Sequence, residues 1–303
     1  MALNIELQMN TPENVALNTS GVPEYAPIQH YHSSLGDSTH TVLSVDTFTM
    51  SVTEGGGTTA TGFYSHVEGA GSRSEGSQSH AEGASTRASG SQSHAEGAST
   101  TASGEQSHAE GVTTTASGMQ AHAEGNFTKA TGDYSHTEGN STQATRDGAH
   151  AEGYSTKASG DYSHAEGYNT QATKDFSHAE GNGAKATGNN AHAEGNDTVA
   201  SGVYSHAEGR ETQSSGLCSH AEGYGTIAAS SYQHVQGQFN VQDSNNAYAH
   251  IVGGGLGAGA RKNIHTIDWN GNAMFAGGIT FFDSNGNEHT LDEILERLTT
   301  LES

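Results

Sequence analysis

Histidine recurs at a fixed interval of 14 residues from His66 to His234, thirteen times and without an insertion or deletion. Twelve of these histidines open the tetrapeptide His-x-Glu-Gly, and the last copy reads His234-Val235-Gln236-Gly237. The loops of a globular enzyme vary in length independently of one another, whereas every coil of a solenoid must stack on the previous coil. The spacing therefore predicts a solenoid built from 14-residue coils.

Each repeat contains two short extended pieces, and each piece is followed by a turn. In residues 163–176 the pieces are Ser163-His164-Ala165-Glu166-Gly167 and Thr170-Gln171-Ala172-Thr173. This pattern predicts an all-β fold, a parallel β-roll with two strands per coil and about 4.8 Å between stacked coils. Because alternate residues of a strand face opposite sides, Ser, Ala and Thr should line the narrow coil. His and Glu should point outward, since burying so many ionisable groups is costly.

The composition is compatible with such a fold and argues against several classes of protein. Only 31% of the 303 residues are hydrophobic, but a coil filled by small side chains needs little apolar bulk. A formal net charge of −23, with 11 Lys and Arg, argues against a nucleic-acid partner. One cysteine, Cys218, excludes an intrachain disulfide framework. With 19 histidines, the surface charge should change steeply between about pH 6 and pH 7.

The sequence shows no feature of a membrane protein. No apolar stretch approaches the roughly 20 residues that span a bilayer. Met1-Ala2-Leu3-Asn4 does not begin a signal peptide. We therefore expect no membrane insertion and no export by that route.

The repeats divide the chain into four expected segments. Residues 1–51 form an N-terminal attachment segment, residues 52–237 the β-roll, residues 238–286 a β-rich connector, and residues 287–303 a C-terminal helix. Asn270-Gly271 between two strand-like runs predicts a β-hairpin in the connector. The helix has candidate caps at Asn287 and Thr290. Its apolar residues step by 3, 4 and 3 residues, as in a coiled coil: Leu291, Ile294, Leu298 and Leu301.

The array over residues 52–237 resembles two groups of known proteins. It is similar to the head of trimeric autotransporter adhesins, whose 14-residue units read approximately Ser-Val-Ala-Ile-Gly followed by Ala-x-Ala-x-Gly. It resembles more closely the Ser-His-Ala-Glu-Gly arrays of phage and prophage tail-fibre or appendage proteins, and residues 261–282 resemble connector modules of phage fibres. The resemblance implies a left-handed parallel β-roll, three chains side by side, and a coiled-coil stalk.

The chain departs from the adhesin pattern in two respects. It has His and Glu where the adhesin repeat has Val and Ile, and it shows neither an export signal nor a membrane anchor. These differences favour the phage proteins as the closer group.

One face of the predicted roll carries a repeated row of His and Glu, which is the main candidate site. Its members are His66, Glu68, His80, Glu82, His94, Glu96, His108, Glu110, His122, Glu124, His136, Glu138, His150, Glu152, His164, Glu166, His178, Glu180, His192, Glu194, His206, Glu208, His220 and Glu222.

Three interpretations of this row are open. It is a solvated polar face, or a seam where His of one chain meets Glu of its neighbour, or a set of axial three-histidine rings that bind Zn²⁺ or Ni²⁺. A charge-assisted hydrogen bond in a partly dry seam contributes about 1.5–3 kcal/mol. We favour the seam, and we predict no catalytic residue, no protein metal site and no cofactor other than such axial ions.

Several tyrosines lie in or beside the predicted turns and are candidate glycan contacts: Tyr154, Tyr168 and Tyr224. Packing within the protein is the alternative role for them. Taken with the resemblance, the sequence predicts a non-enzymatic virion protein: a homotrimeric tail fibre, spike or appendage made in the host cytoplasm. Its expected partners are other virion or tail proteins and a host cell-surface receptor. The alternatives are a polysaccharide-degrading tailspike enzyme and a bacterial surface adhesin.

Overall fold

A computed structural model describes residues 28–30, 43–46, 48–283 and 286–302. The chain divides into two compact units, Met1–Phe176 and Ser177–Ser303. Most of the expected N-terminal attachment segment, at residues 1–27 and 31–42, lies outside the described residues.

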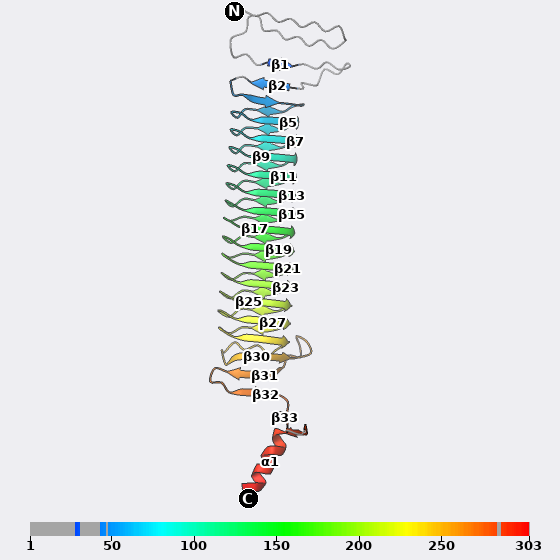
Figure 1. Cartoon of the computed structure of the whole chain (residues 1–303), viewed down its shortest axis with the longest axis vertical. Helices are drawn as coiled ribbons and strands as arrows, with labels where there is room; N and C mark the ends of the chain where they lie inside the picture. The colour runs from blue at the N-terminus through cyan, green and yellow to red at the C-terminus, as the bar shows by residue number, and fades with distance from the viewer. Residues whose placement is uncertain (1–27, 31–42, 47, 284–285, 303) are drawn as a thin grey trace, which may run out of the picture. The chain divides into compact units, whose positions relative to one another are not determined.

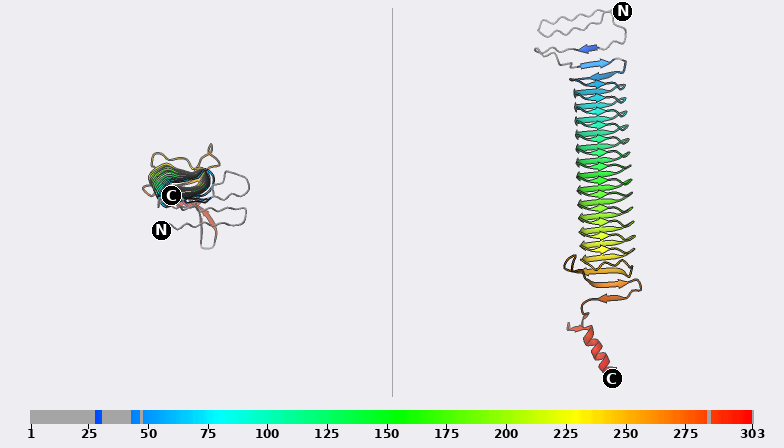
Figure 2. Two further views of the ribbon diagram at one scale, coloured as in Figure 1. Left: turned by 90° about the horizontal axis from the view of Figure 1, so that it is seen from above. Right: turned by 180° about the vertical axis from the view of Figure 1, so that it is seen from behind.

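The first unit is a parallel β-solenoid in which each coil contributes one long and one short strand (Figures 1 and 2). An antiparallel pair, β1 (Ile28–His30) and β2 (Leu43–Asp46), precedes it, and β2 pairs with β3 (Ser51–Thr53). The long strands that follow are β5 (His66–Ala70), β7 (His80–Ala84), β9 (His94–Ala98), β11 (His108–Val112), β13 (His122–Asn126), β15 (His136–Asn140), β17 (His150–Tyr154) and β19 (His164–Tyr168).

The short strands of the first unit form a second parallel sheet. They are β4 (Thr59–Ala60), β6 (Arg73–Ser74), β8 (Arg87–Ala88), β10 (Thr101–Ala102), β12 (Thr115–Ala116), β14 (Lys129–Ala130), β16 (Gln143–Ala144), β18 (Lys157–Ala158) and β20 (Gln171–Ala172). In both sheets each residue pairs with the residue 14 positions later, as His108 does with His122 and Ala102 with Ala116. Identical residues therefore stack in columns, which confirms the predicted solenoid.

The second unit repeats this architecture and then changes it. Its long strands are β21 (His178–Asn182), β23 (His192–Asn196), β25 (His206–Arg210), β27 (His220–Tyr224), β29 (His234–Gln238) and β30 (Tyr248–Gly254). Its short strands are β22 (Lys185–Ala186), β24 (Val199–Ala200), β26 (Gln213–Ser214) and β28 (Ile227–Ala228). Strand β31 (Asn263–Asp268) then pairs antiparallel with β30, which ends the parallel pattern.

The interior of the coils is filled by small side chains, as the alternation predicts. The Ala that follows most of the histidines is fully buried, for example Ala109 and Ala193, and so is the Ala of most short strands, for example Ala116. The Thr that precedes the short strand is also buried, as at Thr114. The Ser that precedes His is held by a hydrogen bond, since the Ser107 hydroxyl donates to the Gly104 carbonyl at 2.7 Å. Most interior positions are therefore filled by Ala, Ser and Thr, and larger side chains such as Val67 and Val235 are exceptions.

Two hairpins and one helix follow the parallel coils. Strand β31 pairs with β32 (Ala273–Phe275) across Asn270-Gly271, which confirms the predicted hairpin. The Asp268 carboxylate accepts hydrogen bonds from the backbone amides of Asn270 and Asn272 and so closes the turn. A second hairpin joins β33 (Thr280–Phe282) to β34 (Glu288–Thr290).

Helix α1 spans Leu291–Glu302, inside the expected C-terminal segment 287–303. Thr290 caps it as predicted, because its hydroxyl accepts from the Glu293 amide while the Glu293 carboxylate accepts from the Thr290 amide. Asn287 is not a cap. Its side chain instead donates to Asp283 in the turn of the second hairpin, a polar role that single-residue preferences do not distinguish from capping.

Candidate functional site: the histidine and glutamate ladders

Every long strand from β5 to β29 places its His first and its Glu or Gln third, on one outward face of its unit. The alanine or valine between them points inward and is fully buried, as at Val67, Ala151 and Val235; Thr137 takes this place in β15. In each unit, the His side chains form one column, the histidine ladder, and the Glu side chains a second column, the glutamate ladder. The structure thus confirms that His and Glu face out of the coil.

The imidazole rings of the histidine ladder stack on one another. In the first unit, the ring centroids of His80 and His94 lie 4.9 Å apart with an angle of 5° between the planes. In the second unit, those of His192 and His206 lie 4.7 Å apart at 1°. The stack is less regular at His122, His136 and His150, where successive planes are tilted by 59° and 37° at the same centroid spacing. The rings can therefore rotate without a change in the spacing of the coils.

The two ladders run side by side within one chain. Nε2 of His94 lies 4.0 Å from the Glu96 carboxylate of the same strand. Across neighbouring coils, Nε2 of His220 lies 3.6 Å from the Glu208 carboxylate. The shortest of these ion pairs, at 3.3 Å, joins His178 and Glu180. The His side chains in these pairs are between 34 and 44% exposed.

Most of these His–Glu approaches are longer than a hydrogen bond. The ring Nε2 atoms are buried although the side chains are partly exposed. Among the residues that the structure describes, the Nε2 atoms of the following histidines have no hydrogen-bond partner: His66, His80, His94, His108, His122, His136, His150, His192, His206, His220 and His234.

Partial burial lowers the pKa of several ladder histidines. Desolvation of the charged ring is the largest cause for His80, His108, His136, His206 and His250, and repulsion by stacked neighbouring histidines adds to it. For His150 the same causes lower the pKa to about 4, although the Glu166 carboxylate opposes them. The charge change expected between pH 6 and pH 7 therefore moves to lower pH for these six rings.

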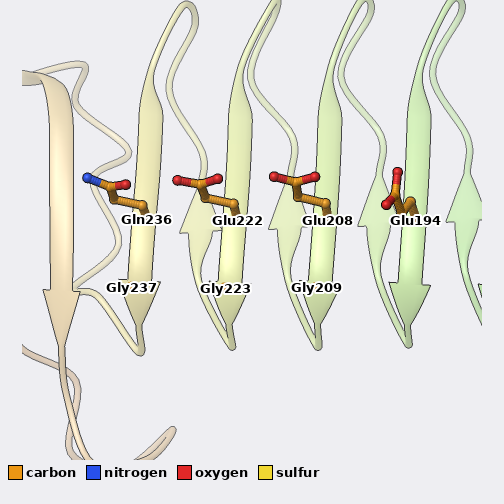
Figure 3. A pocket seen from close by; sticks show the side chains of 7 residues that line it. All are labelled: Glu194, Glu208, Gly209, Glu222, Gly223, Gln236 and Gly237. Carbon is orange, nitrogen blue, oxygen red and sulfur yellow. The ribbon is translucent and has the colours of Figure 1, made fainter.

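The glutamate ladder of the second unit lines an open groove with a volume of about 430 Å³. Figure 3 shows Glu194, Glu208, Glu222 and Gln236 in a row, one from each successive strand and all on the same face. The glycines that follow Glu208, Glu222 and Gln236 also line the groove and leave its floor without side chains: Gly209, Gly223 and Gly237. The groove therefore presents a repeated row of acidic groups rather than one distinct centre.

Three sets of ladder side chains bring potential metal ligands together. They are His192, Glu194 and His206; His220, Glu222 and His234; and Glu54, His66 and Glu68. Within each set, one nitrogen or oxygen atom per residue lies within 4.8 Å of the others. These sets belong to single chains, unlike the axial rings of three histidines expected from the sequence.

The tyrosines predicted as glycan contacts have different surroundings. Tyr154 and Tyr168 end β17 and β19, stack at 5.2 Å and are 50 and 54% exposed. Tyr224 packs edge-on against Phe239, and the Arg210 guanidinium lies 4.8 Å from its ring centroid. Packing thus occupies Tyr224 but leaves the Tyr154–Tyr168 pair open to solvent.

The expected coiled-coil residues lie on helix α1. Leu291 and Ile294 are half-buried, whereas Leu298 and Leu301 are 51 and 83% exposed. In a single chain the apolar side of the helix is therefore largely uncovered.

Sequence reasoning missed two members of the ladders. His250 opens His250-Ile251-Val252-Gly253, which pairs in register with His234-Val235-Gln236-Gly237, so it continues the histidine ladder. Its spacing of 16 residues hides it from a search at 14, although the His-x-x-Gly pattern remains visible. Glu54 precedes Glu68 in the other ladder, and Val52 takes the place of His.

The function of this chain has to be inferred from the site itself. The chain matches no family model, and no curated protein shows significant similarity to it. Over the described part of the chain, no helix combines the length and the apolar character needed to cross a bilayer.

Proposed function

We propose that this chain is a structural attachment protein, a homotrimeric fibre, spike or appendage of a phage particle. The observation that carries the proposal is the run of buried, hydrogen-bond-free Nε2 atoms along one face of a solenoid, in the described residues of both units. Buried polar atoms in native proteins normally find partners. Rotation of the rings, of the kind that separates the planes of His122 and His136 by 59°, would bring these nitrogens to the outward face. A partner with the same repeat would then match them coil by coil, and such a partner is another copy of the chain.

The geometry of the ladders supports such a seam. Glu96, Glu110 and Glu152 are 44 or 45% exposed, so a neighbouring chain has access to their carboxylates. Each charge-assisted hydrogen bond that replaces a long His–Glu approach would contribute about 1.5–3 kcal/mol where water is excluded. Repeated coil after coil, these contacts would fix the register between chains.

Helix α1 supports assembly independently of the ladders. Exposed leucines at Leu298 and Leu301 follow half-buried Leu291 and Ile294 at coiled-coil spacing. Three copies of this helix would bury that stripe. Two heptads hold a coiled coil only when the chains are already joined, so the helix would complete a trimer formed by the solenoids.

In this proposal the solenoid supplies reach and the trimer supplies repeated contacts with the receptor. Three identical copies raise the effective concentration for the second and third contacts. The exposed Tyr154–Tyr168 pair is the proposed glycan contact, because stacked aromatic faces bind sugar rings. The protein would belong to the virion, bound to other tail or particle proteins.

The assembly is tested by the mass of the full chain in solution, measured by sedimentation at several concentrations. We expect a trimer, and replacing His122, His136 and His150 together by Ala should lower its dissociation temperature. A matched triple variant, Lys129→Ala, Gln143→Ala and Lys157→Ala, changes exposed side chains on the short strands of the same region and should leave that temperature unchanged. A monomer, or equal effects of the two triple variants, would contradict the seam.

Attachment needs a separate measurement. Purified trimer should compete with phage particles for adsorption to host cells, and antibodies against it should label an appendage of the particle. Hydrolysis of a host surface glycan by the same preparation would instead support the tailspike enzyme.

A further inference from the structure

We infer that the ladders bind divalent transition-metal ions at three sites within each chain: His192–Glu194–His206, His220–Glu222–His234 and Glu54–His66–Glu68. The inference needs only one chain, so its ligands do not depend on the proposed trimer. At these three sets, however, the metal would take ring nitrogens that the seam would otherwise use. The inference also differs from a metal on a threefold axis, because each site takes its ligands from one strand and an adjacent coil.

The distances between donor atoms fit a metal better than a hydrogen bond. His192 Nε2 lies 3.7 Å from Glu194, His234 Nε2 lies 3.5 Å from Glu222, and His66 Nε2 lies 3.5 Å from Glu54. Zinc binds His nitrogen and carboxylate oxygen at about 2.0–2.2 Å, so two ligands of a tetrahedral ion lie about 3.4 Å apart. One His–Glu pair in each set is thus already near the spacing that an ion requires, and the remaining donor atoms lie within 4.8 Å.

The ring nitrogens at these sites form no hydrogen bond that a metal would have to break. Nε2 of His66, His192, His206, His220 and His234 is buried, and no hydrogen bond to it occurs among the described residues. A buried nitrogen without a partner carries a desolvation cost that coordination would remove. The same atom therefore provides both the ligand and part of the driving force.

Binding requires the stacked rings to rotate. A metal lies in the plane of the imidazole that binds it, whereas the planes of His192 and His206 are parallel within 1°. The torsion that turns an imidazole about its Cβ–Cγ bond has a broad energy profile. His122 and His136 already differ by 59° at a centroid distance of 4.9 Å, so the ladder accommodates the required tilt. The expected change is thus local and leaves the coils in place.

The ligand types select the class of metal. Two imidazoles and one carboxylate, or one imidazole and two carboxylates, suit Zn²⁺, Co²⁺, Ni²⁺ or Cu²⁺ rather than Mg²⁺ or Ca²⁺, which prefer oxygen ligands. Three protein ligands leave a fourth position for water. Glu208 lies between the two sites of the second unit, 4.0 Å from His206 and 3.6 Å from His220, and adds negative charge beside both.

The test measures zinc bound to the full-length chain, prepared without a histidine tag and freed of metal, by equilibrium dialysis and elemental analysis. We expect about three Zn²⁺ ions per chain, one for each set of ligands. The variant Glu194→Gln with Glu222→Gln should bind about two fewer. The matched variant Glu138→Gln with Glu152→Gln alters ladder carboxylates outside the three sets and should bind as much as the original chain.

A second readout distinguishes coordination from loose attraction to acidic groups. Co²⁺ should give the visible absorption of a four-coordinate ion with nitrogen ligands, and excess Mg²⁺ should not displace it. Absence of bound zinc, or equal losses in the two pairs of variants, would overturn the assignment. The mass of each variant in solution is measured on the same samples, so loss of metal is distinguished from loss of the trimer.

Discussion

Gly111 in one coil lies directly over Gly125 in the next, so closely that a Cβ atom on Gly111 would stand 2.1 Å from the Gly125 carbonyl oxygen. The φ angle of Gly111 is +111°, which side chains of L-amino acids rarely adopt. The same close approach and the same positive φ recur at the equivalent glycines of neighbouring coils, including Gly97 and Gly125. The invariant Gly of His-x-Glu-Gly is therefore a requirement of stacking.

Replacing Gly111 by Ala should destabilise the solenoid strongly, by several kcal/mol, because the new methyl group meets backbone and the required φ is strained. Gly71→Ser is the matched control. Its φ is +67°, the nearest atom to a new Cβ is 3.8 Å away, and Ser85 occupies the same position one coil later at φ +58°. Thermal unfolding of the two variants provides the comparison. Similar melting temperatures would show that the column does not need glycine.

The sequence predicted the parts of the fold that depend on backbone alternation. Ala109 and Glu110 alternate between inside and outside because any β-strand requires it, and the period of 14 fixes their register. The site was less predictable. Whether His220 contacts Glu222 of its own strand or Glu208 of the previous coil depends on side-chain torsions, which a repeat pattern does not encode. His250 was missed because an insertion of two residues lengthens only its loop.

Two buried hydroxyls, those of Ser107 and Thr114, should respond differently to removal. The Ser107 hydroxyl donates to Gly104, whereas the Thr114 hydroxyl is buried without a hydrogen-bond partner in the described part of the chain. Ser107→Ala should therefore cost about 1 kcal/mol, and Thr114→Val, which keeps the shape, should be neutral or stabilising. Denaturant unfolding of both variants gives the comparison. An equal loss in the free energy of unfolding for Thr114→Val and Ser107→Ala would show that the hydrogen bond of Ser107 does not account for the difference.

Two equally exposed leucines of α1 test the coiled-coil prediction. Leu298 lies on the predicted seam and is 51% exposed, whereas Leu295 is 50% exposed and lies beside the seam. Leu298→Asp should weaken the proposed trimer more than Leu295→Asp, because only the first would place a carboxylate in the centre of the bundle. Sedimentation over a range of concentrations measures the difference. Equal dissociation of both variants would show that the coiled-coil seam is not formed by Leu291, Ile294, Leu298 and Leu301.

Acid should weaken the solenoid through His150. Desolvation, followed by the charges of His164 and His136, lowers the pKa of His150 from 6.5 to about 4. Between these two values the unfolded chain binds a proton that the folded chain does not, so the free energy of unfolding decreases as the pH falls from about 6.5 to about 4. Below about pH 4 both states are protonated, and this residue causes no further loss.

His150→Gln should remove this part of the pH dependence, and unfolding midpoints measured from pH 7.5 down to pH 4 will show it as a shallower slope. Carboxylates that titrate in the same range remain in both proteins, so the difference between the two slopes isolates His150. Lys157→Ala, on the short strand of the same coil, is the control and should keep the original slope. A resonance of His150 that titrates near pH 6.5 in the folded protein would contradict the burial argument directly, whatever the unfolding data show.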